Sequence, residues 1–173
     1  MMMMIKFLLF TYLVISPISI YADKDLMVNE CHNTQVPTKC MQCLESDPTS
    51  VKATAVGIAS IVINCLDSRL QNITKNITDI LSSKEYKGEL KTTLEDCKKD
   101  LSTEVTTKLS EAKTGLKTGD YDKAGLSIKL ALVFPLTCRA KLKIFMFTSD
   151  ELFSHINIYN QLSDAAMRII DRL

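Results

Sequence analysis

Long stripes of apolar residues at helical spacing constrain the fold of this chain more than any other feature of its sequence. From residue 51 to about residue 82, apolar residues recur at intervals of three and four. Such spacing places them on one face of an α-helix, whereas a β-strand would alternate at every second residue. Three further stripes follow, over about 90–116, 121–142 and 152–170. The first stripe consists of Val56, Ala59, Ile63, Leu66, Leu70, Ile73, Ile77 and Ile80.

The breaks between the stripes predict where the helices end. A polar break at 82–84, followed by Gly88, separates the first helix from the second. Gly119-Asp120 combines a residue that favours helix termination with one that favours an N-cap, and so separates the second helix from the third. Pro135 lies within the third stripe and is expected to kink or split that helix, because proline lacks the N–H that a helix interior uses.

Thr148 and Glu151 predict the start of the fourth helix. They have the spacing of a capping box, in which an N-cap threonine and a glutamate three residues later each accept a backbone N–H. Four long helices with short connections predict an all-α fold, an up-and-down four-helix bundle over residues 50–173. Residues 25–46 are shorter and are broken at Val36-Pro37, which predicts a helical hairpin appended to the bundle.

The N-terminal segment, residues 1–22, is predicted to be a signal peptide. Lys6 precedes a nearly unbroken apolar run, and Ala22 stands just before the charged Asp23. One positive charge, a short apolar core and a small residue at the cleavage position are typical of secretory signals. The run is shorter than the roughly 20 apolar residues of a membrane-spanning helix. Cleavage near Ala22 would leave one exported domain, residues 23–173, that is not held in a membrane.

The composition and motifs of the mature chain argue against several classes of function. Removal of Lys6 from the 21 basic residues leaves 20 against 20 acidic ones, and no clustered basic stretch for a nucleic acid is visible. His32 and His155 have no partner at catalytic spacing, and no phosphate-binding glycine loop or zinc-protease motif occurs. The carboxylates are interleaved with lysines, as on solvated helix faces. We therefore expect no enzyme activity, no catalytic residues, no cofactor and no metal site.

Six cysteines lie in the mature chain, and export through an oxidising compartment favours disulfides between them. Cys31 and Cys40 are predicted to pair across the turn at Pro37, where a bridge would contribute about 2.7 kcal/mol by the chain-entropy model. The alternative is a zinc site that uses His32 and Cys43 as well. The exported compartment favours the disulfide over the zinc site.

Cys97 and Cys138 are predicted to form a second bridge. Antiparallel helices joined at Gly119 place residues at similar distances from that turn side by side, and Cys97 lies 22 residues before it and Cys138 19 after it. The longer loop would contribute about 4 kcal/mol in the same model. Cys43 and Cys65 then form either a third bridge, if the hairpin folds back on the first long helix, or two buried free thiols. We favour the free thiols slightly.

Export also gives meaning to two N-glycosylation sequons, which begin at Asn72 and Asn76. Asn72 lies away from the apolar stripe of its helix, whereas Asn76 lies closer to the flank of that stripe. We therefore expect Asn72 to be the more readily glycosylated of the two.

The predicted hairpin carries the most specific sequence signal. Cys31-x2-Thr34-x5-Cys40 is followed by Leu44-Glu45-Ser46-Asp47-Pro48, and this segment resembles the opening of the plant invertase and pectin methylesterase inhibitor family. Gly119-Asp120-Tyr121-Asp122 is similar to the family's turn between its second and third bundle helices, and Thr137-Cys138 matches its Thr-Cys. The resemblance covers residues 25–173. It implies the same two bridges, a four-helix bundle with an N-terminal hairpin, and no catalytic activity.

The resemblance further implies a secreted protein, in the cell wall or alternatively the vacuole, that occludes a carbohydrate-active enzyme. Invertase inhibitors of the family typically carry Pro-Lys-Phe after the Gly-Asp turn, where this chain has Tyr121-Asp122-Lys123. We therefore expect pectin methylesterase as the partner, with acid invertase as the alternative. A non-inhibitory interaction module is the alternative of a different class. The expected state is a monomer, and a dimer that exchanges its hairpins is the alternative.

The candidates for contact with the target lie on the second and third bundle helices and the turn between them. They are Gly119, Asp120, Tyr121, Asp122, Lys123, Lys99, Thr137 and Arg139. The family's usual Thr-Cys-Glu-Asp is Thr137-Cys138-Arg139-Ala140 here, and Lys98-Lys99 stand where an acidic residue is common. These replacements reverse the local charge, and like charges brought together on docking can cost several kcal/mol. Such a reversal would favour a different isoform, another enzyme or no target.

Overall fold

The computed structural model of the chain describes residues 18–83 and 85–173, and every regular element within them is helical. Most of the predicted signal peptide, residues 1–17 of 1–22, lies outside the described residues. The elements in chain order are α2 (Ile18–His32), α3 (Pro37–Glu45), the 3₁₀ turn η1 (Ser50–Lys52), α4 (Ala55–Ser82), α5 (Gly88–Asp100), the π-helical segment η2 (Leu101–Val105), α6 (Thr106–Thr118), α7 (Tyr121–Ile144) and α8 (Asp150–Ile170).

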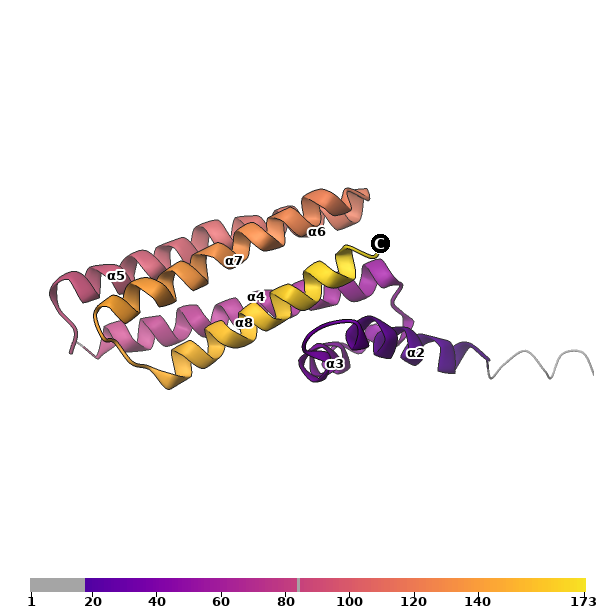
Figure 1. The fold of residues 1–173 in the computed structure, drawn as a ribbon, viewed down its shortest axis with the longest axis horizontal. Coiled ribbons are helices and arrows are strands. Elements are labelled where there is room, and N and C mark those ends of the chain that lie inside the picture. Colours follow the sequence, from indigo (N-terminus) through magenta and orange to yellow (C-terminus); the bar gives the residue numbers. More distant parts are fainter. Residues whose placement is uncertain (1–17, 84) are drawn as a thin grey trace, which may run out of the picture.

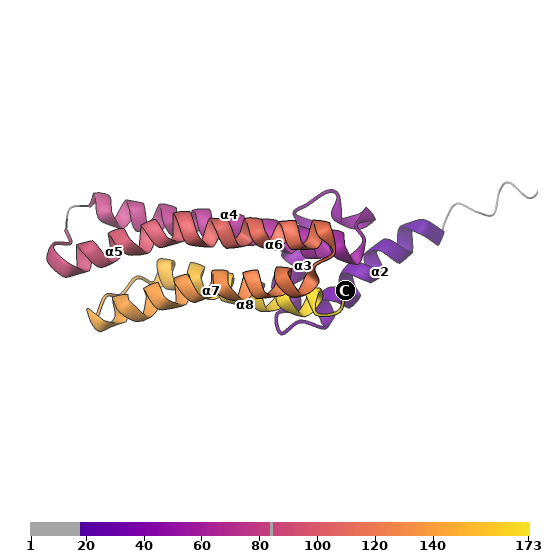
Figure 2. The same cartoon turned by 90° about the horizontal axis from the view of Figure 1, so that it is seen from above.

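Four long rods form the bundle, and Figure 1 shows them side by side. α4, α7 and α8 are single helices, whereas α5, η2 and α6 follow one another without a break and make up the second rod. α4 packs mainly against α8, and α6 mainly against α7. Seen from above, the α5–α6 rod overlies α4 and α7 overlies α8 (Figure 2). The predicted up-and-down four-helix bundle is therefore confirmed.

α2 and α3 form a helical hairpin at one end of the bundle. They pack against each other, and both also contact α4 and α8. The guanidinium of Arg172, next to the C-terminus, donates to the backbone carbonyl of Glu30 at 3.0 Å and to its carboxylate at 2.5 Å. The first helix of the hairpin begins at Ile18, so it starts before the predicted hairpin boundary at residue 25 and spans the predicted cleavage position near Ala22.

The second rod contains a π-helical segment that the sequence analysis did not predict. Cys97, Leu101, Val105 and Leu109 are all buried and follow one another at three successive intervals of four. Four residues turn an α-helix by about 40° more than one full turn, so three such steps would rotate the stripe away from the core. The wider turn of a π-helix absorbs that rotation. The run of equal intervals is therefore the sequence signal of η2.

Pro135 is buried within α7, which continues from Tyr121 to Ile144, so the alternative that Pro135 splits this helix is wrong. The predicted start of α8 also needs correction. The N-cap of α8 is Ser149 rather than Thr148, and its hydroxyl accepts a hydrogen bond from the N–H of Leu152 at 3.2 Å. Because Leu152 occupies the third helical position, Glu151 cannot complete a capping box.

Candidate functional site: the outer face of α6 and α7

The turn between α6 and α7 is closed by two hydrogen bonds. Gly119 has φ 77° and ψ 13°, the left-handed conformation that favours glycine. The N–H of Asp120 donates to the carbonyl of Gly115 at 2.9 Å. The carboxylate of Asp120 accepts from the N–H of Lys123 at 3.1 Å. One aspartate thus takes part in ending α6 and caps α7, as the Gly119-Asp120 pair predicts.

Gly115 brings the two helices into direct backbone contact at this turn. A Cβ atom at Gly115 would lie 2.8 Å from the carbonyl oxygen of Asp120 and 2.9 Å from the backbone nitrogen of Ala124. These neighbours are backbone atoms, which cannot move aside as a flexible side chain can. The absence of a side chain at Gly115 therefore sets the separation of α6 and α7.

An apolar lane runs along the outer side of α7. It consists of Leu126, Leu130 and Val133, whose side chains are 57%, 40% and 51% exposed. Their intervals of four and three place them on one face of the helix, and the buried Ala124, Ile128 and Ala131 lie on the opposite face. The prediction of this helix rested on the inner stripe alone. The sequence signal of the apolar lane is a second apolar stripe, displaced by two residues from the first.

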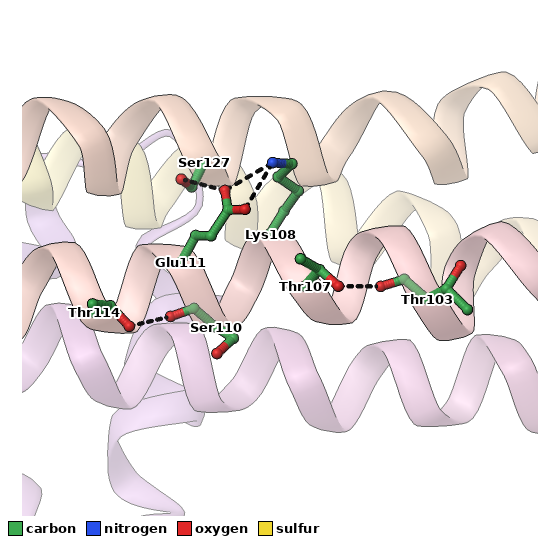
Figure 3. Close-up of polar contacts among 7 residues, drawn as sticks. All are labelled: Thr103, Thr107, Lys108, Ser110, Glu111, Thr114 and Ser127. Carbon is green, nitrogen blue, oxygen red and sulfur yellow. Dashed lines mark hydrogen bonds and ion pairs between the residues drawn. The ribbon is translucent and has the colours of Figure 1, made fainter.

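A hydroxyl lane runs along the outer side of the second rod. It consists of Thr103, Thr107, Ser110 and Thr114, all of which are exposed (Figure 3). The hydroxyl of Thr107 donates to the carbonyl of Thr103 at 2.8 Å, and that of Thr114 donates to the carbonyl of Ser110 at 3.0 Å. Bonds of this kind hold short side chains against the helix. The result is a flat polar strip on the second rod, which packs beside α7 and its apolar lane.

Glu111 links the two helices between the lanes. Its carboxylate accepts from the ammonium of Lys108 at 2.8 and 2.9 Å, and from the hydroxyl of Ser127 on α7 at 3.5 Å (Figure 3). The hydrogen bond from Lys108 is the main reason that the pKa of Glu111 lies below its ordinary value. The lowered pKa favours the charged carboxylate, which is the form that binds Lys108 and Ser127.

The structure separates the predicted contact residues into three groups. Asp120, Asp122 and Lys123 are exposed and Tyr121 is half-buried at the α6–α7 turn. Thr137 borders a depression of about 230 Å³ beside the Cys97–Cys138 bridge, and Lys99 is exposed two residues after Cys97.

Arg139 does not join either of these groups. Its guanidinium lies over the ring of Phe153 on α8, 5.7 Å from the ring centroid, and its side chain is half-buried. Thr137 and Arg139 are two residues apart on one helix and so point in nearly opposite directions. Of the positively charged replacements, Lys99 rather than Arg139 changes the charge near the outer face.

All six cysteines, which lie within the described residues, form disulfides. The structure contains the Cys31–Cys40 and Cys97–Cys138 bridges. It also joins Cys43 to Cys65, so the free-thiol alternative that we favoured is wrong. The physical reason is that the hairpin folds back on the bundle, where α3 packs against α4.

Comparison with known proteins identifies the family. A model of the plant invertase/pectin methylesterase inhibitor family matches residues 25–169. The chain belongs to this family. The pectinesterase inhibitor of Actinidia deliciosa is 27% identical over 168 residues, which cover 95% of this chain and 84% of the relative. The family is one of inhibitor proteins, in agreement with the expectation that this member is not an enzyme.

Two solved structures of pectin methylesterase inhibitors from Arabidopsis share the fold. A mutant form A superposes with a TM-score of 0.71 and 19% identity, and the match covers 85% of this chain and 96% of the other. The other structure, of a pectin methylesterase inhibitor from Arabidopsis thaliana, superposes with a TM-score of 0.64 and 19% identity, and the match covers 87% of this chain and 97% of the other. At this level of identity the likeness concerns the fold of the family.

The described part of this family member offers no constellation for metal chemistry. Within residues 18–83 and 85–173, no three histidine, cysteine or acidic side chains are grouped so that they could hold a metal ion. Of the two histidines, His32 is exposed, and the Nε2 atom of His155 lies 3.8 Å from a carboxylate oxygen of Glu151 on the same helix.

No helix in the described part of the chain is long and apolar enough to cross a membrane.

The two sequons of α4 differ in accessibility. Asn72 is exposed, whereas Asn76 is only 9% exposed. A glycan on Asn72 would extend into solvent, while one on Asn76 would have to emerge from the contact between α4 and α8. Glycosylation at Asn72 therefore stays our prediction.

Proposed function

We propose that this chain is a secreted inhibitor of pectin methylesterase, and that it covers the enzyme's substrate groove with the outer face of α6 and α7. Membership of an inhibitor family and the likeness to the Actinidia pectinesterase inhibitor support this proposal. The observation that carries it is the apolar lane of α7. Exposed apolar stripes next to polar surface are typical of protein interaction sites.

The outer face of α6 and α7 is rigid, which suits an inhibitor that acts by shape complementarity. The backbone contact at Gly115 and the Glu111 link hold α6 against α7, and the Cys97–Cys138 bridge holds α5, at the other end of the same rod, against α7. A rigid surface loses little conformational entropy on binding, so more of the contact energy remains as affinity. The short side chains of the hydroxyl lane let a partner approach the helix closely, while Leu126, Leu130 and Val133 supply apolar area.

Pectin methylesterase is favoured over acid invertase by the residues after the turn. Tyr121 and Asp122 stand at the N-terminus of α7, where a carboxylate is stabilised by the helix dipole and Tyr121 packs against the core. They differ from the Pro-Lys-Phe segment that invertase inhibitors typically carry. Lys99 adds a positive charge near the same face, and this charge should influence which isoform of the enzyme the chain binds. Assays with several isoforms test that influence.

The proposal is tested with purified mature protein and two panels of plant enzymes, pectin methylesterases and acid invertases, assayed at mildly acidic pH. We expect loss of activity in the pectin methylesterase panel only. Loss in the invertase panel alone would identify the other target class. Full activity in both panels would contradict an inhibitory role and favour a non-inhibitory interaction module.

A separate experiment tests export. Expression of the full chain in plant cells, with Edman sequencing of the protein recovered from the wall fraction, should give a mature N-terminus near Asp23. Recovery of the uncleaved chain inside the cells would contradict the proposed signal peptide.

A further inference from the structure

The Cys43–Cys65 bridge has more access to solvent than the other two disulfides. Cys31 and Cys40 are fully buried, and Cys97 and Cys138 each expose 3% of their surface. Cys65, in contrast, is half-buried, and its partner Cys43 is 6% exposed. Both line a surface pocket of about 300 Å³ between α3, α4 and α8, which is large enough to admit a small thiol.

The charged side chains that line this pocket are all positive. Lys39 precedes Cys43 by four residues on α3, and Arg69 follows Cys65 by four residues on α4, so each cation lies one turn from a sulfur on the same helix face. Among the described residues, neither cation forms an ion pair. The depression beside the Cys97–Cys138 bridge differs, because its lining combines the negative charge of Asp100 with the positive charge of Lys141.

These features favour thiol–disulfide exchange at one bridge. A nearby cation attracts an incoming thiolate and stabilises the thiolate that leaves, and both effects speed the exchange. We propose that Cys43–Cys65 is a thiol–disulfide exchange site, opened by a dithiol reductant, and that its opening releases the α2–α3 hairpin from the bundle. This inference does not depend on the identity of the inhibited enzyme.

The reaction proceeds in two displacements. A thiolate of the dithiol attacks the Sγ of Cys65, the more exposed residue of the bridge, so a mixed disulfide forms and the Cys43–Cys65 bond breaks. Cys43 leaves as a thiolate near Lys39 and takes a proton from water. The second thiol of the reductant then displaces Cys65, which is also protonated. The reductant ends as a disulfide, and the protein gains two electrons and two protons.

Opening this bond removes the one disulfide that ties the hairpin to the bundle. Cys31–Cys40 lies within the hairpin and Cys97–Cys138 lies within the bundle, so both units keep their own bridge. The hairpin would then be held by apolar packing and by the contact of Arg172 with Glu30. Its separation from the bundle should therefore become easier while the four rods stay folded.

The test uses the intact mature protein and reduced dithiothreitol at neutral pH. Samples are alkylated at successive times, and each labelled cysteine is located by peptide mass spectrometry. We expect Cys43 and Cys65 to be labelled about tenfold faster than the other four cysteines, which serve as internal controls. Equal rates for the three bridges, or earlier opening of another bridge, would overturn the proposal.

Charge variants test the role of the two cations. Lys39→Gln and Arg69→Gln should each slow the opening of Cys43–Cys65 several-fold, whereas Lys129→Gln, at an exposed lysine on α7, should leave it unchanged. Unchanged rates in all three variants would overturn the electrostatic part of the proposal.

Hydrogen exchange tests the release. After selective reduction, the amides of α3 should exchange faster and those of α7 at the same rate as before. Unchanged exchange in α3 would show that the hairpin stays docked, and would overturn the release.

Discussion

The two turns that flank α7 use the same hydrogen-bond pattern with different residues. Gly119 takes the left-handed position after α6, with φ 77°, and Met146 takes it after α7, with φ 53°. In each turn the N–H of the following residue bonds to a carbonyl five residues earlier, at 2.9 Å before α7 and at 3.2 Å after it. Glycine adopts this conformation freely, whereas a side chain there costs about 1 kcal/mol.

The difference shows that the two ends of α7 are held in place by different means. At the first turn the helices meet backbone to backbone at Gly115, so steric fit sets their spacing. Towards the second turn, the Cys97–Cys138 bridge holds α7 to the α5–α6 rod covalently. At this second turn the residue in the left-handed conformation, Met146, is 90% exposed. Substitutions at the two ends of α7 should therefore change the free energy of unfolding by different amounts and in different directions.

The largest expected change in stability comes from removing the Cys97–Cys138 bridge. Joint replacement of Cys97 and Cys138 by serine should lower the free energy of unfolding by about 4 kcal/mol, because it removes a long closed loop from the unfolded state. Urea denaturation measures the loss. The matched control replaces Cys31 and Cys40, whose bridge spans 9 residues instead of 41, and should lose only about 2.7 kcal/mol. A smaller loss for the long loop than for the short one would contradict the comparison.

The next largest change in stability is expected at the α6–α7 turn, where Gly115 sets the spacing of the helices. Gly115→Ala should destabilise the fold by about 1–3 kcal/mol, because the added methyl group meets backbone atoms of α7 and forces the helices apart. Gly125→Ala is the matched control, since outside the adjoining backbone of its own helix the nearest atom to its Cβ would be Cγ2 of Ile170, at 3.8 Å. That control should be neutral or stabilising, because alanine favours helix more than glycine does. Equal thermal stability of the two variants would show that α6 and α7 are not held by backbone fit.

Gly119→Ala isolates the backbone conformation from steric contact. Apart from Gly119 itself and its two chain neighbours, no heavy atom of the described residues lies within 4 Å of the position that its Cβ would take. We expect a loss of about 1 kcal/mol from the left-handed φ alone, measured by urea denaturation. A loss as large as that of Gly115→Ala would indicate an unrecognised contact at the turn.

The smallest effect should have the opposite sign. Met146→Gly relieves the left-handed strain after α7 and should raise the free energy of unfolding by up to about 1 kcal/mol. Met146→Ala keeps the strain and serves as the control, with no gain expected. If both variants melt at the temperature of the unaltered chain, the conformation at Met146 stores no strain.

The sequence predicted those features of the fold that follow from local pattern. The apolar stripes of α4 and α8, the stop at Gly119 and the cap at Asp120 all depend on residues near one another in the chain. The N-cap at Ser149 was misplaced by one residue, because Thr148 and Ser149 are both good caps and only the packing of the loop decides between them.

Features that depend on how elements pack were less predictable. Cys43–Cys65 requires the hairpin to dock on α4, and no local pattern reports that contact. The separation of Arg139 from the outer face depends on Phe153, which belongs to another helix. The apolar lane, in contrast, has a local signal, a second stripe on α7, but a stripe alone does not show which of two apolar faces packs in the core.

The central claim is that the outer face of α6 and α7 docks on the inhibited enzyme. The most direct test compares Val133→Asp, on the apolar lane, with Val51→Asp, which lies outside the lane. The two valines are matched because they are 51% and 48% exposed. Both variants should fold, as checked by circular dichroism. With a pectin methylesterase that the unaltered chain inhibits, Val133→Asp should raise the inhibition constant by about tenfold or more, since it places a charge in the contact. Val51→Asp should leave that constant unchanged. Equal inhibition constants for the two variants would contradict the claim.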